Sequence, residues 1–183
     1  WLTADAKQLK AYEELRRRFR PEGNWIRFGY LKAFIDGTLG SGTALMFEPF
    51  TDNPDTCGLP QMPYVELERR VLAADRRGFQ IGVHAIGDAG NRETLDFIAS
   101  VYAQHPGARD QRHRIEHAQV IAPEDFQLFG EYSILPSVQP THATSDMYWA
   151  EQRIGPERMK GAYAYKRLLE ENGWIPNGSD FPV

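Results

Sequence analysis

Side chains able to bind a metal ion or move a proton follow the apolar segments of this sequence one after another. The segment FQIGVH ends in His84, and Asp88 follows in a glycine-rich turn. The comparable positions after four other apolar segments hold Lys32 and Asp36, His117, Gln139 and His142, and Asp180. A single histidine after an apolar run is often a buried residue bonded to the backbone. Five such placements instead indicate a shared site.

The residue types define the chemistry that such a site would perform. Two imidazoles and a carboxylate, as in His84, His117 and Asp180, suit Zn²⁺ or another first-row divalent ion. Such an ion lowers the pKa of a bound water to about 7, and a carboxylate can take the released proton. This chemistry serves hydrolysis at a carbonyl or amidine-like carbon. Two histidines on separate strands are weaker evidence than an H-E-x-x-H helix would be.

Alternating strand-like and helix-like segments must position these residues. We expect strands at 25–35, 79–84, 113–120, 132–140 and 174–183, and helices at 3–19, 63–78, 89–104, 122–130 and 155–173. Thr3 is the expected N-cap of the first helix. Residues 36–60 form a loop whose length is typical of a functional segment. The alternation predicts parallel strands, whose carboxyl ends share one ligand-binding face.

Two architectures fit this alternation: an open doubly wound sheet and part of a (β/α)₈ barrel. No G-x-G-x-x-G follows a predicted strand, and no G-x-x-x-x-G-K-[ST] occurs in the sequence. The nucleotide-binding form of the open sheet therefore lacks its usual motifs.

Composition narrows the classes of partner. The chain has 183 residues, is 42% hydrophobic and 25% charged, and has a net charge of −4, which argues against nucleic acid or an anionic membrane as main partner. Its basic runs, ELRRRFR and ERRVLAADRR, are expected to be solvated helix faces. With Cys57 as the only cysteine, no internal disulfide forms, which fits a cytoplasmic protein. There is no apolar stretch of about 20 residues and no signal-peptide pattern.

Five segments, in order, resemble the amidohydrolase superfamily, specifically the YtcJ-like branch of amidohydrolase family 3: LKAFIDGTLGSGTA, GVHAIGDAG, HRIEHAQ, PSVQPTH and NGSDFPV. The resemblance implies an α/β metal-dependent hydrolase with a (β/α)₈ TIM barrel. Residues 1–183 would be the C-terminal part of that barrel domain, strands 4 to 8, without strands 1 to 3 or any small β domain. It also implies a small-molecule substrate, whose non-peptide, amide-type carbon–nitrogen bond is hydrolysed by metal-activated water.

The resemblance also assigns roles. Lys32 matches a strand-4 lysine that in relatives can be carboxylated to bridge two metals, and His84 and His117 match metal-binding histidines ending strands 5 and 6. Asp180 matches the strand-8 aspartate that binds metal and acts as general acid and base. The implied cofactor is one or two divalent ions, with zinc the expected metal. For His142 we expect proton transfer or substrate contact.

Other residues receive supporting roles. Asp36 and Asp88 are expected to shape turns, with an indirect role at the site or toward substrate also open, and Gln139 is assigned to the same group. Glu116 should point away from His117, because side chains alternate along a strand, and is expected to pack or support the site. We expect ordinary structural roles for six other residues: His105, His113, Tyr148, Trp149, Tyr163 and Tyr165.

Two departures from the family pattern matter. Gly42 stands where the family often has an arginine, and the H-x-H pair of barrel strand 1 is missing. A full barrel takes about 250 residues, so we expect a fragment. Its strands at 25–35 and 174–180 would have free edges, so we expect the fragment to self-associate or to pair with a missing companion segment. We also expect the isolated fragment to hold little metal and to be inactive. The alternative is a catalytically incomplete remnant, and other chemistry on the same scaffold stays open.

Overall fold

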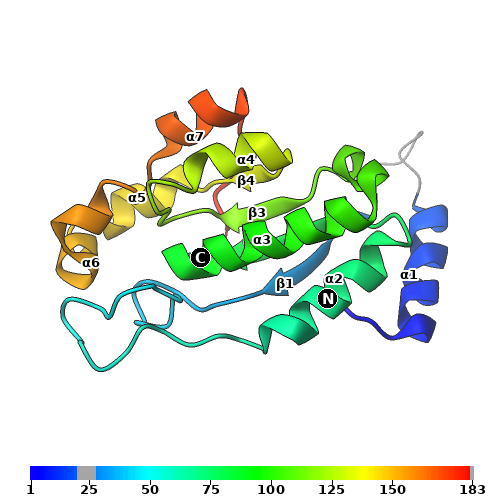
Figure 1. Cartoon of the computed structure of the whole chain (residues 1–183), viewed down its shortest axis with the longest axis horizontal. Coiled ribbons are helices and arrows are strands. Elements are labelled where there is room, and N and C mark those ends of the chain that lie inside the picture. The colour runs from blue at the N-terminus through cyan, green and yellow to red at the C-terminus, as the bar shows by residue number, and fades with distance from the viewer. Residues whose placement is uncertain (20–27, 182–183) are drawn as a thin grey trace.

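The sheet at the centre of the chain has four parallel strands. The computed structural model describes residues 1–19 and 28–181, with only the backbone described for residues 108–110. The strands lie in the order β1-β2-β3-β4, with β1 at Leu31–Phe34, β2 at Ile81–Ala85, β3 at Arg114–His117 and β4 at Leu135–Ser137 (Figure 1). Each strand thus pairs with its neighbour in sequence, as the helix–strand alternation predicts.

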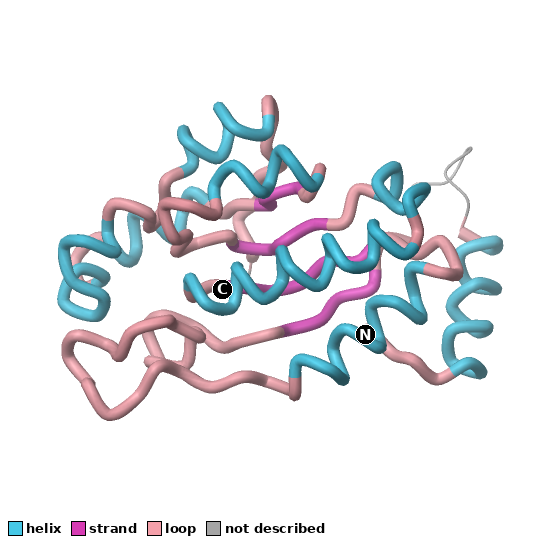
Figure 2. The backbone as a smooth tube through the Cα atoms, viewed as in Figure 1, coloured by secondary structure: helices cyan, strands magenta, loops and turns pink. Residues whose placement is uncertain are grey.

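Seven α-helices accompany the sheet in the described residues: α1 (Ala6–Arg18), α2 (Tyr64–Asp75), α3 (Asp88–Gln104), α4 (Phe126–Tyr132), α5 (Pro140–Asp146), α6 (Ala150–Met159) and α7 (Tyr165–Asn172). A short 3-10 helix, η1, covers Pro106–Gln111. Helices α2 and α3 pack against β2, and α4 packs against α3 and α7 (Figures 1 and 2). No helix in the described ranges is long and apolar enough to span a membrane.

Strand β2 lies at the middle of the main hydrophobic core. All of its residues are buried, and Ile81 and Val83 belong to the same apolar cluster as residues of α2, α3 and α4. A second, smaller apolar cluster lies beneath the long loop at 35–63, with Leu39, Phe50 and Ile154 among its members. The loop therefore has a core of its own, shared with α6.

Two arginines of α6 fasten the long loop. The Arg158 guanidinium donates to the backbone oxygens of Glu48 and Pro49, each at 2.8 Å. Arg153 donates to the Gly40 oxygen at 2.8 Å and pairs with Asp52 at 3.0 Å. Loop and α6 lie together beyond the carboxyl ends of the strands (Figure 1). The loop and α6 therefore lie next to the strand ends at which the predicted site residues are found.

The structure corrects several predicted elements near the ends of the chain. Helix α1 begins at Ala6 and is capped by Asp5, whose carboxylate accepts the Gln8 N–H at 2.7 Å, so the expected cap by Thr3 is wrong. The predicted strand at 174–183 is absent from its described part, where Asn177 forms only an isolated parallel bridge with Val138. Of the strand predicted at 25–35, residues 25–27 lie outside the described residues.

The predicted single helix at 155–173 is two helices, α6 and α7. Gly155 has φ +75° and is followed by Pro156, which bends α6 at its middle. Tyr163 has φ +52°, and its N–H donates to the Gln119 oxygen at 2.7 Å, so the chain leaves the helical path between α6 and α7. Helix α5 begins at the last residue of the strand predicted at 132–140 and continues into a stretch for which no element was predicted, with Pro140 in its first turn.

Candidate functional site

A pocket of about 590 Å³ lies at the carboxyl ends of the strands. Five of the predicted site residues line it: Lys32, His84, His117, His142 and Asp180. They come from β1, β2, β3, α5 and the C-terminal segment, so four elements and a loop converge on one space. Asp36, Asp88 and Gln139 do not line the pocket and are buried beside or beneath it.

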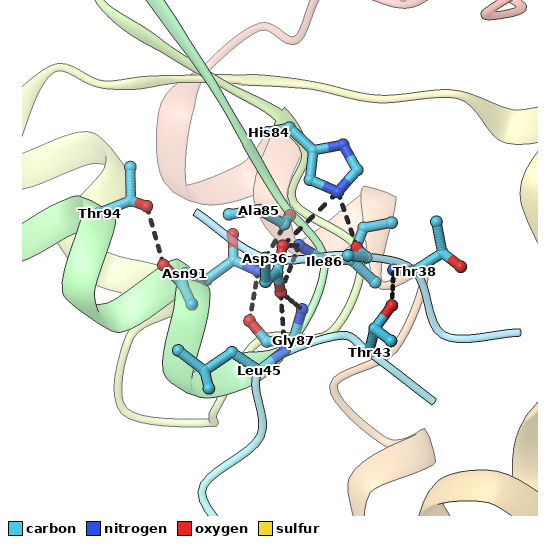
Figure 3. A network of polar contacts seen from close by, with 12 residues as sticks. Asp36, Thr38, Thr43, Leu45, His84, Ala85, Ile86, Gly87, Asn91 and Thr94 are labelled. Carbon is cyan, nitrogen blue, oxygen red and sulfur yellow. Dashed lines mark hydrogen bonds and ion pairs between the residues drawn. The ribbon is translucent and has the colours of Figure 1, made fainter. Parts of the chain in front are cut away.

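His84 is held in one tautomer by the long loop. Its Nε2 lies 2.7 Å from the Gly37 carbonyl oxygen, which can only accept, so Nε2 carries the hydrogen and Nδ1 keeps a lone pair. Burial lowers the His84 pKa to about 4, and the Gly37 hydrogen bond partly opposes this shift. Figure 3 shows the second ring nitrogen pointing away from this network. At neutral pH, His84 is therefore uncharged, and its Nδ1 keeps an accepting lone pair.

His117 reaches the pocket because the backbone turns sharply at the end of β3. Its φ is +79°, and Ala118 follows with φ +44°. The His117 ring lies 4.4 Å from that of His84, centroid to centroid, and stacks on His142 at 5.6 Å. Burial, with the neighbouring His84 and Lys32, lowers the His117 pKa to about 2. Three imidazoles thus form a row along one wall.

Two ring nitrogens in this row have no hydrogen-bond partner within the described part of the chain. They are Nδ1 of His117 and Nε2 of His142, and both atoms are buried. A buried polar atom without a partner costs about 1–3 kcal/mol, so such atoms are uncommon outside ligand sites. The His142 nitrogen is available to a ligand, whereas the His117 ring also interacts with the Gln139 side chain, which raises the His117 pKa against the effect of burial.

Lys32 and Asp180 complete the charged part of the pocket. Burial lowers the Lys32 pKa, while the carboxylates of Glu116 and Asp180 oppose that shift. The Lys32 ammonium lies 5.1 Å from the centroid of the Phe34 ring. Asp180 is exposed and adopts φ +56°, a conformation uncommon for residues other than glycine. The Lys32 ammonium therefore interacts electrostatically with two carboxylates, those of Glu116 and Asp180.

Glu116 faces the same side of the sheet as His84, which contradicts the expected alternation. The two residues are paired in register across β2 and β3, so their side chains share a face. Glu116 pairs with Arg114 and acts electrostatically on Lys32. The prediction failed because His117, with its left-handed backbone, lies outside the regular pleat. Its expected supporting role stays a prediction, and its carboxylate acts electrostatically on Lys32.

Asp36 is the hub between the long loop and His84. Its carboxylate is fully buried and accepts the N–H groups of Leu45, Ile86 and Gly87, the closest at 2.8 Å (Figure 3). Its Oδ1 also lies 3.5 Å from His84 Nε2. Burial raises the Asp36 pKa to about 7, although the three backbone hydrogen bonds oppose this. Asp36 thus shapes the turn, as expected, and also contacts the His84 ring.

Asp88 and Gln139 hold neighbouring backbone. Asp88 Oδ1 accepts the N–H groups of Phe47 at 2.9 Å and Ala89 at 2.8 Å, and so joins the long loop to the start of α3. Gln139 precedes α5, and its amide nitrogen donates to the Ser137 oxygen at 3.2 Å. Gln139 Oε1 is buried without a partner in the described residues.

The buried Asp88 gives the chain a testable pH dependence. Burial raises the Asp88 pKa, so the folded chain holds this proton more tightly than the unfolded chain. The resulting stabilisation is present below the unfolded pKa of about 3.9 and is lost as pH rises through the folded pKa. Asp88→Asn keeps the accepting oxygen but does not titrate. We expect the free energy of unfolding, wild type minus variant, to fall as pH rises from 4, measured by urea unfolding.

The matched control for this pH dependence is Asp96→Asn, which removes the same charge from an exposed position on α3. Its difference curve with wild type should stay flat compared with that of Asp88→Asn. A rise in the Asp88 difference curve with pH would contradict the assignment of the shift to burial.

His105 and His113 lie at the opposite, amino end of the strands, as expected for structural residues. His105 Nδ1 and His113 Nε2 lie 2.8 and 3.0 Å from the two carboxylate oxygens of Asp75. His113 Nδ1 accepts the Ile81 N–H at 3.2 Å. These contacts tie α2 to α3 and β3, away from the pocket.

The pocket residues that sequence reasoning missed include Gln119, Ser145, Asp146 and Trp149. Trp149 was expected to pack, and its ring does pack over Gly40, about 3.5 Å from the position of a Cβ there, while lining the pocket. Pro140 after Gln139 is a helix-start signal that would have revealed α5 and hence Asp146, one turn after His142.

The free nitrogens test whether these residues fit a divalent metal ion. Neutral imidazoles with an available nitrogen are usual ligands of such ions, and His84 and His117 both meet this requirement. Within the described ranges, however, no three His, Cys, Asp or Glu side chains gather closely enough to hold a metal. His84 and His117 could therefore supply part of the ligands of a metal ion, but the described residues do not supply a complete set.

Comparisons with known proteins identify the family of this chain. Residues 2–183 match the family model described as "Amidohydrolase family". The chain is 44% identical over 160 residues to "Protein LONG AFTER FAR-RED 3" of Arabidopsis thaliana, covering 87% of this chain and 27% of that protein. It is 35% identical over 161 residues to "Putative amidohydrolase YtcJ" of Bacillus subtilis (strain 168), covering 88% and 30%.

A solved structure has the same fold. An uncharacterized metal-dependent hydrolase from Pyrococcus furiosus aligns with a TM-score of 0.80 at 32% identity, covering 95% of this chain and 36% of that one. The chain thus spans about a quarter to a third of the length of these relatives.

Proposed function

Since its family model matches residues 2–183, the chain belongs to the amidohydrolase family, and we propose that it supplies part of the active site of a metal-dependent hydrolase acting on carbon–nitrogen bonds. The observation that carries the proposal is the convergence of two neutral imidazoles, His84 and His117, with Lys32 and Asp180 in one pocket. The comparisons do not favour the alternative of an inactive remnant.

We place the chain as residues of strands 4 to 8 in a (β/α)₈ barrel domain. The parallel order of β1 to β4 supports this placement, and the parallel bridge between Val138 and Asn177 puts the C-terminal segment where a fifth strand would pair. The edge of β1 and the segment at 174–180 would then meet the rest of the barrel, or a second copy of the chain in its absence.

In this proposal His84 and His117 hold the ion, Zn²⁺ being the metal best suited to imidazole and carboxylate ligands, with Lys32 and Asp180 beside it. The bound metal supplies a Lewis acid and activates water. The lowered pKa of Lys32 increases its neutral amine fraction, the form that reacts with CO₂, which supports carboxylation of this residue. Further ligands would come from outside the described residues, because these offer only a partial set.

The remaining steps belong to the side chains of this chain. Asp180, which is exposed and lines the pocket, would take a proton from the attacking water and return it to the leaving nitrogen. His142, whose buried Nε2 has no partner among the described residues, would contact the substrate oxygen. Glu116 would attract the Lys32 ammonium in the uncarboxylated state, and Asp36 would keep His84 in its tautomer.

Chelation tests the metal and the reaction together. We expect the full-length protein to hydrolyse members of a panel of amides and N-acylated amines. Dialysis against a chelator should lower kcat/KM by about 100-fold or more. Added Zn²⁺ should restore activity. Full activity in metal-free protein, measured alongside its metal content, would contradict the proposal. Hydrolysis of matched esters alone would contradict the carbon–nitrogen assignment.

A further inference from the structure

The wall of the pocket formed by α5 carries a carboxylate that the proposed chemistry does not use. Thr141, His142, Ser145 and Asp146 line the pocket from this helix. Asp146 lies four residues after His142, which places it on the same helix face about 6 Å further along the axis. His142 itself stacks on His117. Asp146 therefore lies in the same pocket as the row of imidazoles, about one helical turn from His142.

Neutral groups hold the Asp146 carboxylate in place. Tyr163 donates its hydroxyl to Oδ2 at 2.7 Å, and the Gln119 amide reaches the same oxygen at 3.3 Å. Ser145 donates to Oδ1 at 2.8 Å. The Gln119 amide also donates to the Tyr163 hydroxyl at 3.0 Å, so the two donors are connected. The carboxylate is fixed in position from both sides.

Tyr163, which makes this contact, has an unfavourable backbone conformation. Its φ of +52° is uncommon for an aromatic residue and costs of order 1 kcal/mol. Burial and the Asp146 charge both raise the Tyr163 pKa, so the phenol remains a proton donor. The fold thus accepts strain at Tyr163 and orients its hydroxyl toward Asp146.

Among the residues that the structure describes, no cationic side chain pairs with Asp146. Within residues 1–19 and 28–181, none of the ion pairs involves Asp146. The lysine of the pocket, Lys32, lies toward Asp180 and Glu116, whose charges act on it. A half-buried carboxylate with only neutral donors is suited to a cationic ligand, since buried charges are normally paired.

Apolar side chains surround the space between Asp146 and the histidines. Phe34, Leu39, Ile86 and Trp149 contribute to the lining, and Leu39 and Ile86 are themselves buried. Trp149 and Phe34 offer aromatic surfaces, which favour packing against an aromatic ring of a ligand. The space is therefore suited to an apolar, preferably aromatic, group.

We propose that Asp146 is a specificity-determining residue that binds the ammonium group of an arylalkylamine portion of the substrate, whose aromatic body packs among Phe34, Leu39, Ile86 and Trp149. This inference rests on the proposed function only in calling the ligand a substrate. The ammonium would lie about one helical turn from the imidazoles, so the substrate is an amide carrying a protonated amine at that separation from the bond to be cleaved.

Binding of small probes to the full-length protein, after a chelator has removed its metal, tests the inference without turnover. Phenethylammonium and 2-phenylethanol have the same aromatic body and differ in the charge of the terminal group, and 3-phenylpropionate carries the opposite charge. We expect NMR titration to give the cation an affinity about tenfold above that of the alcohol, consistent with a charge-assisted hydrogen bond, and the anion to bind most weakly. The cation preference should shrink with added salt.

Three variants identify the residue responsible. Asp146→Asn should abolish the preference, so that the cation and the alcohol bind with about equal affinity. Asp96→Asn, the same charge change at an exposed position of α3, should leave the preference intact. Tyr163→Phe, which keeps the ring, should give an intermediate value. Circular dichroism and the dispersion of the NMR spectrum verify that each variant is folded.

Equal affinities for cation and alcohol, a preference that survives in Asp146→Asn, or no binding of either probe below about 10 mM would each overturn the inference. None of these outcomes bears on metal dependence, which chelation of the full-length protein measures. Conversely, cation binding that depends on Asp146 in a protein without hydrolase activity would leave the binding site established and the proposed function wrong.

Discussion

Alanine in place of His84 or His117 should lower kcat/KM of the full-length hydrolase by about 1,000-fold or more and remove metal from the purified protein. Groups that merely orient a metal ligand change affinity or activity by 10- to 100-fold, so loss of a ligand itself should exceed that range. Both imidazoles are neutral at pH 7 because burial lowers the pKa of each, and both keep a nitrogen with a lone pair. Metal analysis and steady-state kinetics provide the measurement.

His105→Ala is the matched control for these variants. It removes an imidazole from the amino end of the strands, where His105 contacts Asp75, and should leave the metal content and kcat/KM near wild type. Retention of metal and activity in both pocket variants would show that the ion, if present, is held elsewhere. A loss equal to theirs in His105→Ala would assign the effect to stability.

The four strands and the helices between them could be predicted because their signals are local. The apolar run at 78–86 forms the buried strand β2, and the spacing of Leu95, Ile98 and Tyr102 matches the buried face of α3. Polar residues after each strand were correctly expected at one end of the sheet, since parallel strands bring their carboxyl ends together. The structure accordingly places Lys32 and His84 in one pocket.

The features that could not be predicted depend on tertiary contacts. Tyr163 leaves the helical path where its N–H meets the Gln119 oxygen, which no local pattern in AYAYKRLL indicates. His117 faces the pocket through a left-handed backbone that the alternation of a strand cannot represent. Pro140 could have placed Asp146 on a helix, but the orientation of the Asp146 carboxylate depends on donors from the loop after β3 and from the segment before α7. Long-range hydrogen bonds decided all three.

Asp36 is the residue on which the long loop depends most, and Asp36→Ala should lower the free energy of unfolding by about 3–5 kcal/mol. The substitution leaves the N–H groups of Leu45, Ile86 and Gly87 without acceptors, and each buried unsatisfied donor costs about 1–3 kcal/mol. A Cβ at Gly87 would lie 2.0 Å from the Leu45 oxygen, so loop and strand pack too closely there for water to replace the carboxylate.

Asp36→Asn separates the hydrogen bonds from the rest of the side chain. An amide oxygen in the place of Oδ2 keeps the bonds to Leu45 and Gly87, while the amide nitrogen would face the Ile86 N–H, so we expect a smaller loss of about 1–2 kcal/mol. Asp55→Ala, an exposed aspartate of the same loop, serves as the control and should change stability by less than about 0.5 kcal/mol. Urea unfolding followed by circular dichroism gives all three values.

The loss should also reach the candidate site, because Asp36 and Gly37 together hold His84 Nε2. Without the carboxylate, the loop can withdraw the Gly37 oxygen, and the ring is then free to rotate or change tautomer. We therefore expect Asp36→Asn, which remains folded, to weaken Zn²⁺ binding by the full-length protein by about 10- to 100-fold. Unchanged stability in Asp36→Ala, or unchanged Zn²⁺ affinity in Asp36→Asn, would show that His84 is oriented by the pocket itself and that the loop only covers it.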